Sequence, residues 1–196
     1  SQLRGGTVEN LNNNYNVLFN YLLSIVEFNE NEYKSKMQVH DALNNNDYPS
    51  ICLWFGKDTF CQMNLLTIYQ VLKQYNYQGI VKTVLFDENE PWDKILHQKP
   101  LETNWETISD LYQKVLVERK SVECDDEIMD CAIQLYLDLH DSNGRLNQLI
   151  RQYPSMSENE LVEMLMEHSK KEGLSDVQAL EMIRKVREAK WSVVCL

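Results

Sequence analysis

A short apolar run that ends at a glycine and passes into helical spacing is the feature that most constrains this fold. It occupies residues 50–66 and has the sequence S-I-C-L-W-F-G-K-D-T-F-C-Q-M-N-L-L. The apolar half predicts a buried strand over Ile51–Phe55, and the spacing after Gly56 predicts a helix over Thr59–Tyr75. A strand that delivers polar residues to the start of a helix is typical of an α/β protein.

A second predicted strand, Ile80–Phe86, follows a turn at Gly79 and makes a β-α-β unit. Two strands joined by a crossover helix pair in parallel, with a right-handed connection. We therefore predict an α/β fold with a small parallel sheet, Rossmann-like but incomplete, and a mostly helical C-terminal half. In such sheets ligands bind in the crevice outside the carboxyl ends of the strands.

The spacing of apolar residues divides the chain into three regions. Residues 1–48 are predicted to form N-terminal helices, the first of them capped by Thr7. Residues 49–104 form the β-α-β core, which ends in a predicted loop over Trp92–Asn104. Residues 105–196 are helical, with a candidate final strand in the tail W-S-V-V-C-L. The main helices expected there are Trp105–Arg119, Glu123–Ser142, Ser157–Glu172 and Ser175–Lys190.

Local signals mark two helix ends in the second half. Ser157 and Glu160 have the spacing of a capping box, and Gly173 suits the left-handed residue that follows a helix. Cys124 and Cys131 are seven residues apart, so we expect them on one side of one helix, in the core and too far apart to share a zinc ion. The four histidines are scattered singly, and no metal site is predicted.

Charge and hydropathy limit the expected partners. The 196 residues include 19 Lys and Arg and 30 Asp and Glu, for a formal net charge of −11. This balance argues against the broad phosphate-neutralising surface that nucleic-acid binding needs. Because no apolar run of about 18 residues and no signal-peptide pattern occur, we expect a cytoplasmic protein without a membrane partner. The five cysteines are widely spaced and are expected to be reduced.

Polar side chains gather at the predicted ends of the two strands. Since neighbouring strands lie roughly 4.8 Å apart, groups that follow both strands can reach one crevice. The indole of Trp54 could floor that crevice, although a strand tryptophan is more commonly part of the core. The predicted ligand-binding residues are Trp54, Lys57, Asp58, Gln62, Asp87 and Glu88.

One of these side chains, that of Asp58, has a second interpretation. Asp58, like its neighbour Thr59, stands where a side-chain oxygen caps a helix, which is the expected role. Alternatively, Asp58 acts together with a carboxylate that follows the second strand, Asp87, Glu88 or Glu90, to hold a cation or a sugar hydroxyl.

The predicted helix start offers further chemistry. Gly56 and Lys57 could present backbone amides and a cation to an anion there, although neither glycine-rich phosphate motif is present. Cys61 lies in the first turn, where the helix dipole would lower the pKa of its thiol. The alternative for Cys61 is a small buried apolar residue.

The run Leu53–Leu66, together with R-Q-Y-P at 151–154 and G-L-S-D at 173–176, resembles an uncharacterised bacterial family known as domain of unknown function 1835. The resemblance covers roughly residues 50–185. Family members begin with an additional strand and a small-residue turn, which this chain lacks at its start. The resemblance implies the fold and the position of the site, and it implies no reaction. The residues that match the family motif are Trp54, Phe55, Asp58, Phe60 and Gln62.

Two functions fit the predicted crevice. We favour a ligand-binding or regulatory protein without turnover, because no recognisable pair of nucleophile and base emerges. The alternative is an enzyme that acts on a phosphorylated or nucleotide-like small molecule, with Asp58 or Glu88 as the acid or base. The sequence assigns neither a catalytic residue nor a cofactor.

The helical half suggests a third class of function, an interaction protein or DNA-binding regulator. Two helices separated by Gly173 have the outline of a helix-turn-helix module. Its phosphate contacts would come from the last helix, through Arg184, Lys185, Arg187 and Lys190. The favoured alternative is a helical bundle that packs on the α/β core or on a second copy of the chain as a homodimer.

Overall fold

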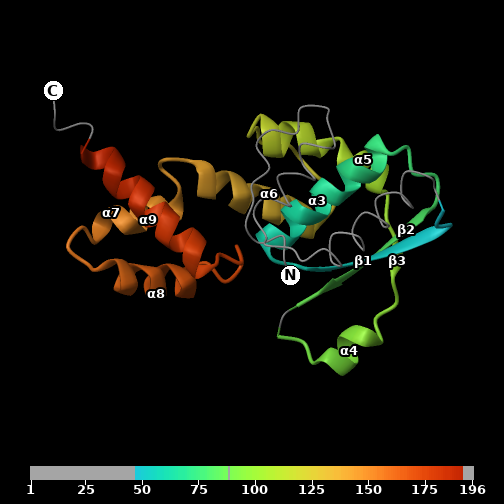
Figure 1. Cartoon of the computed structure of the whole chain (residues 1–196), viewed down its shortest axis with the longest axis horizontal. Helices are drawn as coiled ribbons and strands as arrows, with labels where there is room; N and C mark the ends of the chain where they lie inside the picture. The colour runs from blue at the N-terminus through green and yellow to red at the C-terminus, as the bar shows by residue number, and fades with distance from the viewer. Residues whose placement is uncertain (1–46, 88, 192–196) are drawn as a thin grey trace, which may run out of the picture.

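The computed structural model describes residues 47–87 and 89–191 and has an α/β architecture, as predicted (Figure 1). The predicted N-terminal helices, Glu88 and the candidate final strand lie outside the described residues. The elements are β1 (Ser50–Gly56), α3 (Thr59–Gln74), β2 (Ile80–Phe86), α4 (Trp92–Leu96), β3 (Leu101–Glu102), α5 (Trp105–Ser109), the π-helix η1 (Gln113–Val117), α6 (Glu127–His140), α7 (Arg145–Gln152), α8 (Glu158–His168) and α9 (Asp176–Trp191).

The described sheet has three strands in the order β1-β2-β3. Strands β1 and β2 pair in parallel, with Ile51 opposite Val81, and β3 pairs antiparallel to β2. The prediction of an unstructured loop over Trp92–Asn104 is therefore wrong, because this stretch contains both α4 and β3. Helix α4 is a single short turn, too short to show a helical period in the sequence.

Helix α3 covers one face of the sheet. Alternate residues of β1, Ile51, Leu53 and Phe55, pack on the same core as the buried side chains of α3. Trp54 lies between them in sequence and therefore points to the opposite face, where 41% of its surface is exposed. The expectation that Trp54 belongs to the core is wrong.

The helical half departs from the prediction at two places. The expected helix Trp105–Arg119 is divided into α5 and η1. Helix α6 begins at Glu127, because Asp126 caps it by accepting a hydrogen bond from the Met129 amide at 2.8 Å. Cys124 thus precedes the helix, and Cys131 on α6 is exposed, so the prediction of two core cysteines on one helix is wrong.

The predicted helix-end signals of the second half are confirmed. Ser157 and Glu160 form a reciprocal capping box at the start of α8. Gly173, between α8 and α9, has a φ of +68°, a backbone conformation that favours glycine.

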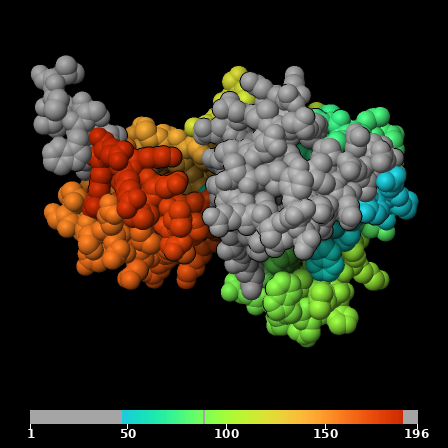
Figure 2. Space-filling view, viewed as in Figure 1, coloured from blue at the N-terminus to red at the C-terminus, as the bar shows by residue number. Residues whose placement is uncertain are grey.

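Two apolar clusters hold the described molecule together. The first joins β1, β2, α3, α5, η1 and most of α6. The second joins α7, α8 and α9 with Leu139 at the end of α6 and Phe60 at the start of α3. Figure 2 shows α7–α9 as a lobe beside the larger part of the molecule. Helix α6 contributes residues to both clusters, so the boundary between the two clusters falls within α6.

None of the helices within residues 47–87 and 89–191 is both long and apolar enough to cross a bilayer.

Candidate functional site

The start of α3 is capped from two directions. Asp58 supplies the local cap, since its Oδ1 accepts a hydrogen bond from the Cys61 amide at 2.9 Å and its carbonyl accepts one from Gln62 at 3.0 Å. The remaining amides of the first turn find acceptors far along the chain. Thr59 N donates to the carbonyl of Lys171 at 3.0 Å, and Phe60 N donates to the carbonyl of Glu172 at 3.3 Å.

These bonds change the expected role of the helix start. All four of its first amides have protein acceptors, two of them in the turn between α8 and α9. The hypothesis that Gly56 and the neighbouring amides present a cradle to an anion is therefore wrong. The capping role expected of Asp58 is confirmed.

The turn between α8 and α9 approaches Asp58 closely. A Cβ placed on Gly173 would lie 2.4 Å from Asp58 Oδ1, and one placed on Gly56 would lie 2.7 Å from Oδ2. The carboxylate is thus held between two glycine backbones. Its Oδ2 is buried and has no hydrogen-bond partner within the described residues.

An ion pair with a buried carboxylate fixes the same turn on its other side. Glu172 is only 2% exposed and pairs with Arg145 at the start of α7. The Arg145 guanidinium also donates to the carbonyl of His168 at 3.1 Å. Because two charged hydrogen bonds converge on this short turn, its carbonyls are held in position to accept from α3.

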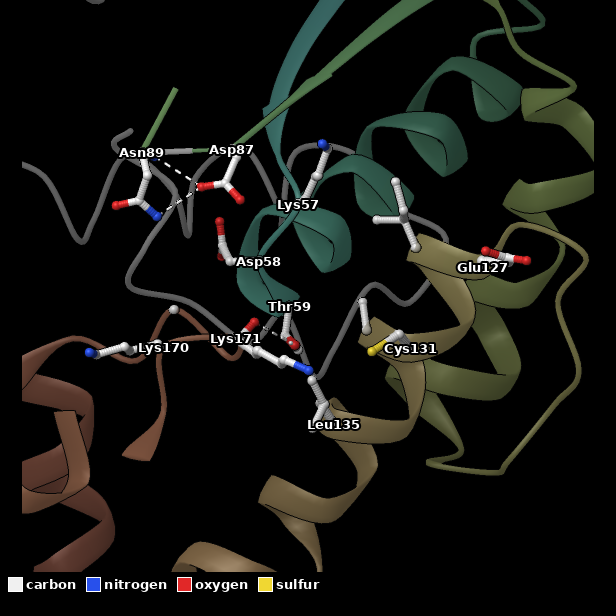
Figure 3. Close-up of a pocket in the computed structure, with 13 residues that line it drawn as sticks. Lys57, Asp58, Thr59, Asp87, Asn89, Glu127, Cys131, Leu135, Lys170 and Lys171 are labelled. Carbon is white, nitrogen blue, oxygen red and sulfur yellow. Dashed lines mark hydrogen bonds between the residues drawn. The ribbon is translucent and has the colours of Figure 1, made fainter. Parts of the chain in front are cut away.

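A cavity of about 480 Å³ opens where this turn meets the carboxyl ends of β1 and β2. We call it the junction pocket. Its walls come from the start of α3, the segment after β2, one side of α6 and the turn between α8 and α9 (Figure 3). The lining residues are Lys57, Asp58, Thr59, Asp87, Asn89, Glu127, Ile128, Cys131, Ala132, Leu135, Lys170, Lys171 and Gly173.

Charged groups of both signs line this pocket. Lys171 extends from the turn toward Cys131 and Leu135 of α6, whereas Lys170 points the other way (Figure 3). Glu127 stands on α6, and Lys57 follows β1.

Asp87 is ionised at neutral pH. Hydrogen bonds from the backbone and side-chain amides of Asn89, both 2.9 Å long, lower the pKa of its carboxyl group, and the charge of Lys57 lowers it further.

The predicted site residues are brought together only in part. Lys57, Asp58 and Asp87 line the junction pocket. Gln62 does not, because its buried amide donates to the carbonyl of Gly56 at 2.6 Å and ties α3 to the end of β1. Trp54 lies on the far face of the sheet, away from α3.

The predicted site lacked the lining residues of the helical half, among them the side chains of Glu127, Cys131, Lys170 and Lys171. They belong to the helical half, about 40 to 115 residues beyond the predicted strand ends in sequence. Their own sequence carries no signal of a site. Gly173 does predict a tight turn in this region, but no sequence pattern shows that the turn contacts the start of α3.

A larger cavity of about 690 Å³ lies between α3, β3 and α5. Its polar floor is already satisfied by the protein. The hydroxyl groups of Tyr69 and Thr83 are 2.8 Å apart, and Thr103 Oγ1 donates to Thr83 Oγ1 at 2.9 Å. Burial raises the pKa of Cys124 at its rim, which keeps that thiol protonated.

The cation hypothesis for the strand ends finds no donor cluster. Within residues 47–87 and 89–191, no group of three or more His, Cys, Asp or Glu side chains is placed to hold a metal ion. Glu90 does not line the junction pocket, and its carboxylate accepts hydrogen bonds from the side chain of Gln98 at 2.9 Å and from the amide of Asp87 at 3.3 Å.

In comparisons with known proteins, no family model, no curated protein and no solved structure matches the chain. The functional argument therefore rests on the residues of the junction pocket.

Proposed function

We propose that this protein binds a small polar molecule in the junction pocket and does not turn it over. The proposed ligand carries an anionic group and a hydroxyl or amino group. The sheet then serves as an incomplete Rossmann-like unit, whose missing wall is supplied by the turn between α8 and α9. We also propose that the chain is a member of the family called domain of unknown function 1835.

One observation carries the proposal: a pocket of ligand size is walled by segments from both apolar clusters, and the charges that line it form no ion pair with a described residue. Clefts that hold small molecules measure roughly 300–1,000 Å³, and the junction pocket measures about 480 Å³. The ammonium groups of Lys57 and Lys171 have no ion-pair partner among the described residues. An anionic group would meet these cations, while Asp87 and Glu127 would accept hydrogen bonds from the rest of the ligand.

Binding without turnover is supported by the state of the reactive groups. The hydroxyl of Thr59 donates to the carbonyl of Lys171 at 3.3 Å, and the Asp58 carboxylate caps α3. The thiol of Cys131 has no hydrogen-bonded base among the described residues. A nucleophile paired with a base, which an acyl- or phosphoryl-transfer site requires, is thus not found among the described lining residues.

Thermal unfolding against a panel of nucleotides, sugar phosphates and amino acids tests this function. A ligand at about 100 times its Kd stabilises the native state by about 2.7 kcal/mol. We expect the stabilisation by a hit to fall in Lys171→Ala and in Glu127→Gln. Both side chains line the pocket, and neither makes a hydrogen bond or ion pair with a described residue.

The matched control is Lys94→Ala, which removes an exposed lysine on α4. Stabilisation that survives both pocket substitutions would place the ligand elsewhere. A hit that is also consumed over time would overturn the absence of turnover. If no compound stabilises the protein, the proposal of a small-molecule site in this pocket fails for these ligand classes.

A further inference from the structure

A third cavity lies on the other side of the turn between α8 and α9. It measures about 400 Å³ and opens between the end of α6, α7 and α9. Neighbouring residues divide the two sites: Thr59 and Gly173 line the junction pocket, whereas Phe60 and Leu174 line this cavity. Its apolar floor consists of Phe60, Leu139, Leu174, Met182 and Val186.

The polar lining of this cavity is basic. Arg119, Arg151 and Lys185 carry permanent positive charges, and Glu181 is the single carboxylate among the described lining residues. The surplus of cations occurs in a chain whose net charge is −11. We call this site the basic cavity.

Two of these cations, Arg151 and Lys185, retain the capacity to bind a ligand. Lys185 has no ion pair within the described part of the chain. Arg151 uses one guanidinium nitrogen, which donates to the carbonyl of Ser142 at 2.6 Å, and a guanidinium has five N–H donors. By contrast, Arg184 and Arg187, which lie on α9 with Lys185, are already engaged. Arg184 pairs with Glu158 at the start of α8, and Arg187 donates to the carbonyl of Met156, which precedes α8.

An irregular backbone segment brings Arg119 to the rim. The π-helix η1 precedes it, and Arg119 itself has a φ of +51°. A non-glycine residue in this left-handed region is strained, and both π-helical turns and such strain are concentrated at functional sites. The turn is closed by a hydrogen bond of 2.8 Å from the Lys120 amide to the carbonyl of Lys114. Arg119 is thus held at the cavity at a cost in backbone energy.

We propose that the basic cavity binds a small organic anion with an apolar body, such as a medium-chain carboxylate. The apolar body lies on the floor formed by Leu174 and Met182, and the anionic group lies among Arg119, Arg151 and Lys185. Apolar walls with a few convergent polar groups are typical of small-molecule sites. A compact organic anion matches both the floor and the charge of the rim.

Fluorescence of an anilinonaphthalene sulfonate dye, displaced by octanoate, tests this site in the full chain. We expect octanoate to displace the dye and octanol, which has the same body without the charge, to compete roughly tenfold less well. Lys185→Gln should weaken octanoate binding roughly twofold to fivefold, and Glu181→Gln should strengthen it, because a contact between exposed charges changes an affinity by a factor of about five at most. Both positions are exposed, so neither substitution threatens the fold.

The control is Lys171→Ala, which alters the junction pocket and leaves the basic cavity intact. Octanoate affinity should be the same in this variant as in the parent chain. Equal competition by octanol and octanoate would overturn the proposal. An octanoate affinity that is unchanged in both Lys185→Gln and Glu181→Gln would overturn it as well. A loss confined to Lys171→Ala would instead assign octanoate to the junction pocket.

Discussion

Two buried tyrosines differ in what their hydroxyl groups meet. The hydroxyl of Tyr69 lies 2.8 Å from that of Thr83, whereas the buried Tyr112 hydroxyl has no hydrogen-bond partner within the described residues. Burial raises the pKa of both groups, so both remain protonated at neutral pH. A buried hydroxyl without a partner costs about 1–3 kcal/mol, while a satisfied one contributes about 1 kcal/mol.

We therefore expect phenylalanine to act oppositely at these two positions. Tyr112→Phe should leave the free energy of unfolding unchanged or raise it by up to about 1 kcal/mol. Tyr69→Phe should lower it by about 1 kcal/mol, since it removes a hydrogen-bonded hydroxyl from the core. Urea unfolding of the two variants and the parent chain measures both effects. A clear loss of stability in Tyr112→Phe would mean that its hydroxyl has a partner.

A second residue-scale prediction concerns the cap of α3. Asp58→Ala removes the acceptor for the Cys61 amide and should lower the free energy of unfolding by about 1 kcal/mol. Asp58→Ser keeps a capping oxygen and omits the buried Oδ2, so it should cost less. Urea unfolding without added ligand makes the comparison. Equal losses in the two variants would show that the cap is not what Asp58 contributes to stability.

At the scale of elements, success of the sequence-based predictions depended on local signals. β2 has the predicted bounds, Ile80–Phe86, and the capping box at Ser157 was predicted from four residues. The failures are non-local. η1 and β3 depend on contacts with other elements, and neither has a pattern of its own in the sequence.

The candidate site divides in the same way. Lys57, Asp58 and Asp87 follow predicted strands and could be placed at one edge of the sheet from the sequence. Lys171 and Glu127 complete the same pocket from helices whose docking no sequence pattern predicts. Gln62 lies outside this pocket for a different reason, because a polar side chain near a helix start can bond to the backbone as readily as to a ligand.

A prediction at this scale concerns the start of α8. Hydrogen bonds from the side chain and the backbone amide of Ser157 lower the pKa of Glu160 from its ordinary value of 4.5. Because the folded-state pKa is lowered, the stabilisation is present above the unfolded-state pKa and is lost as the pH falls through the folded-state pKa.

We expect Ser157→Ala to raise the pKa of Glu160 without fully restoring its ordinary value, since the amide of residue 157 can still donate. A carboxyl-carbon NMR titration measures the pKa of Glu160 in the variant and in the parent chain. As an internal control, the pKa of Asp87, which depends on Asn89, should be unchanged by this substitution. An unaltered Glu160 titration would contradict the assigned cause.

At the scale of the whole molecule, two clusters are joined by one helix and one turn. The ion pair between Arg145 and Glu172 is half-exposed on the arginine side and buried on the glutamate side. Removing one partner of such a pair leaves a buried charge uncompensated. The stability of the turn between α8 and α9, and with it the junction pocket, therefore depends on Arg145.

Arg145→Ala should lower the free energy of unfolding by about 1–3 kcal/mol, because Glu172 then keeps a charge in a site that is 2% exposed. The double variant Arg145→Ala/Glu172→Gln should recover part of that loss, since it removes the stranded charge. Chemical denaturation of the parent chain and the variants tests both statements. No recovery in the double variant would mean that Arg145 acts through packing and its bond to His168.

The hydrogen bonds at the start of α3 have a consequence for how the protein is made. Thr59 and its acceptor at Lys171 are separated by 112 positions in sequence. A ribosome therefore releases β1, α3 and β2 long before the carbonyls that complete the first turn of α3 have been synthesised. Until then, water must occupy those amides, and the edge of the sheet that faces the junction pocket stays unfinished. The pocket is thus among the last parts of the described fold that a growing chain can assemble.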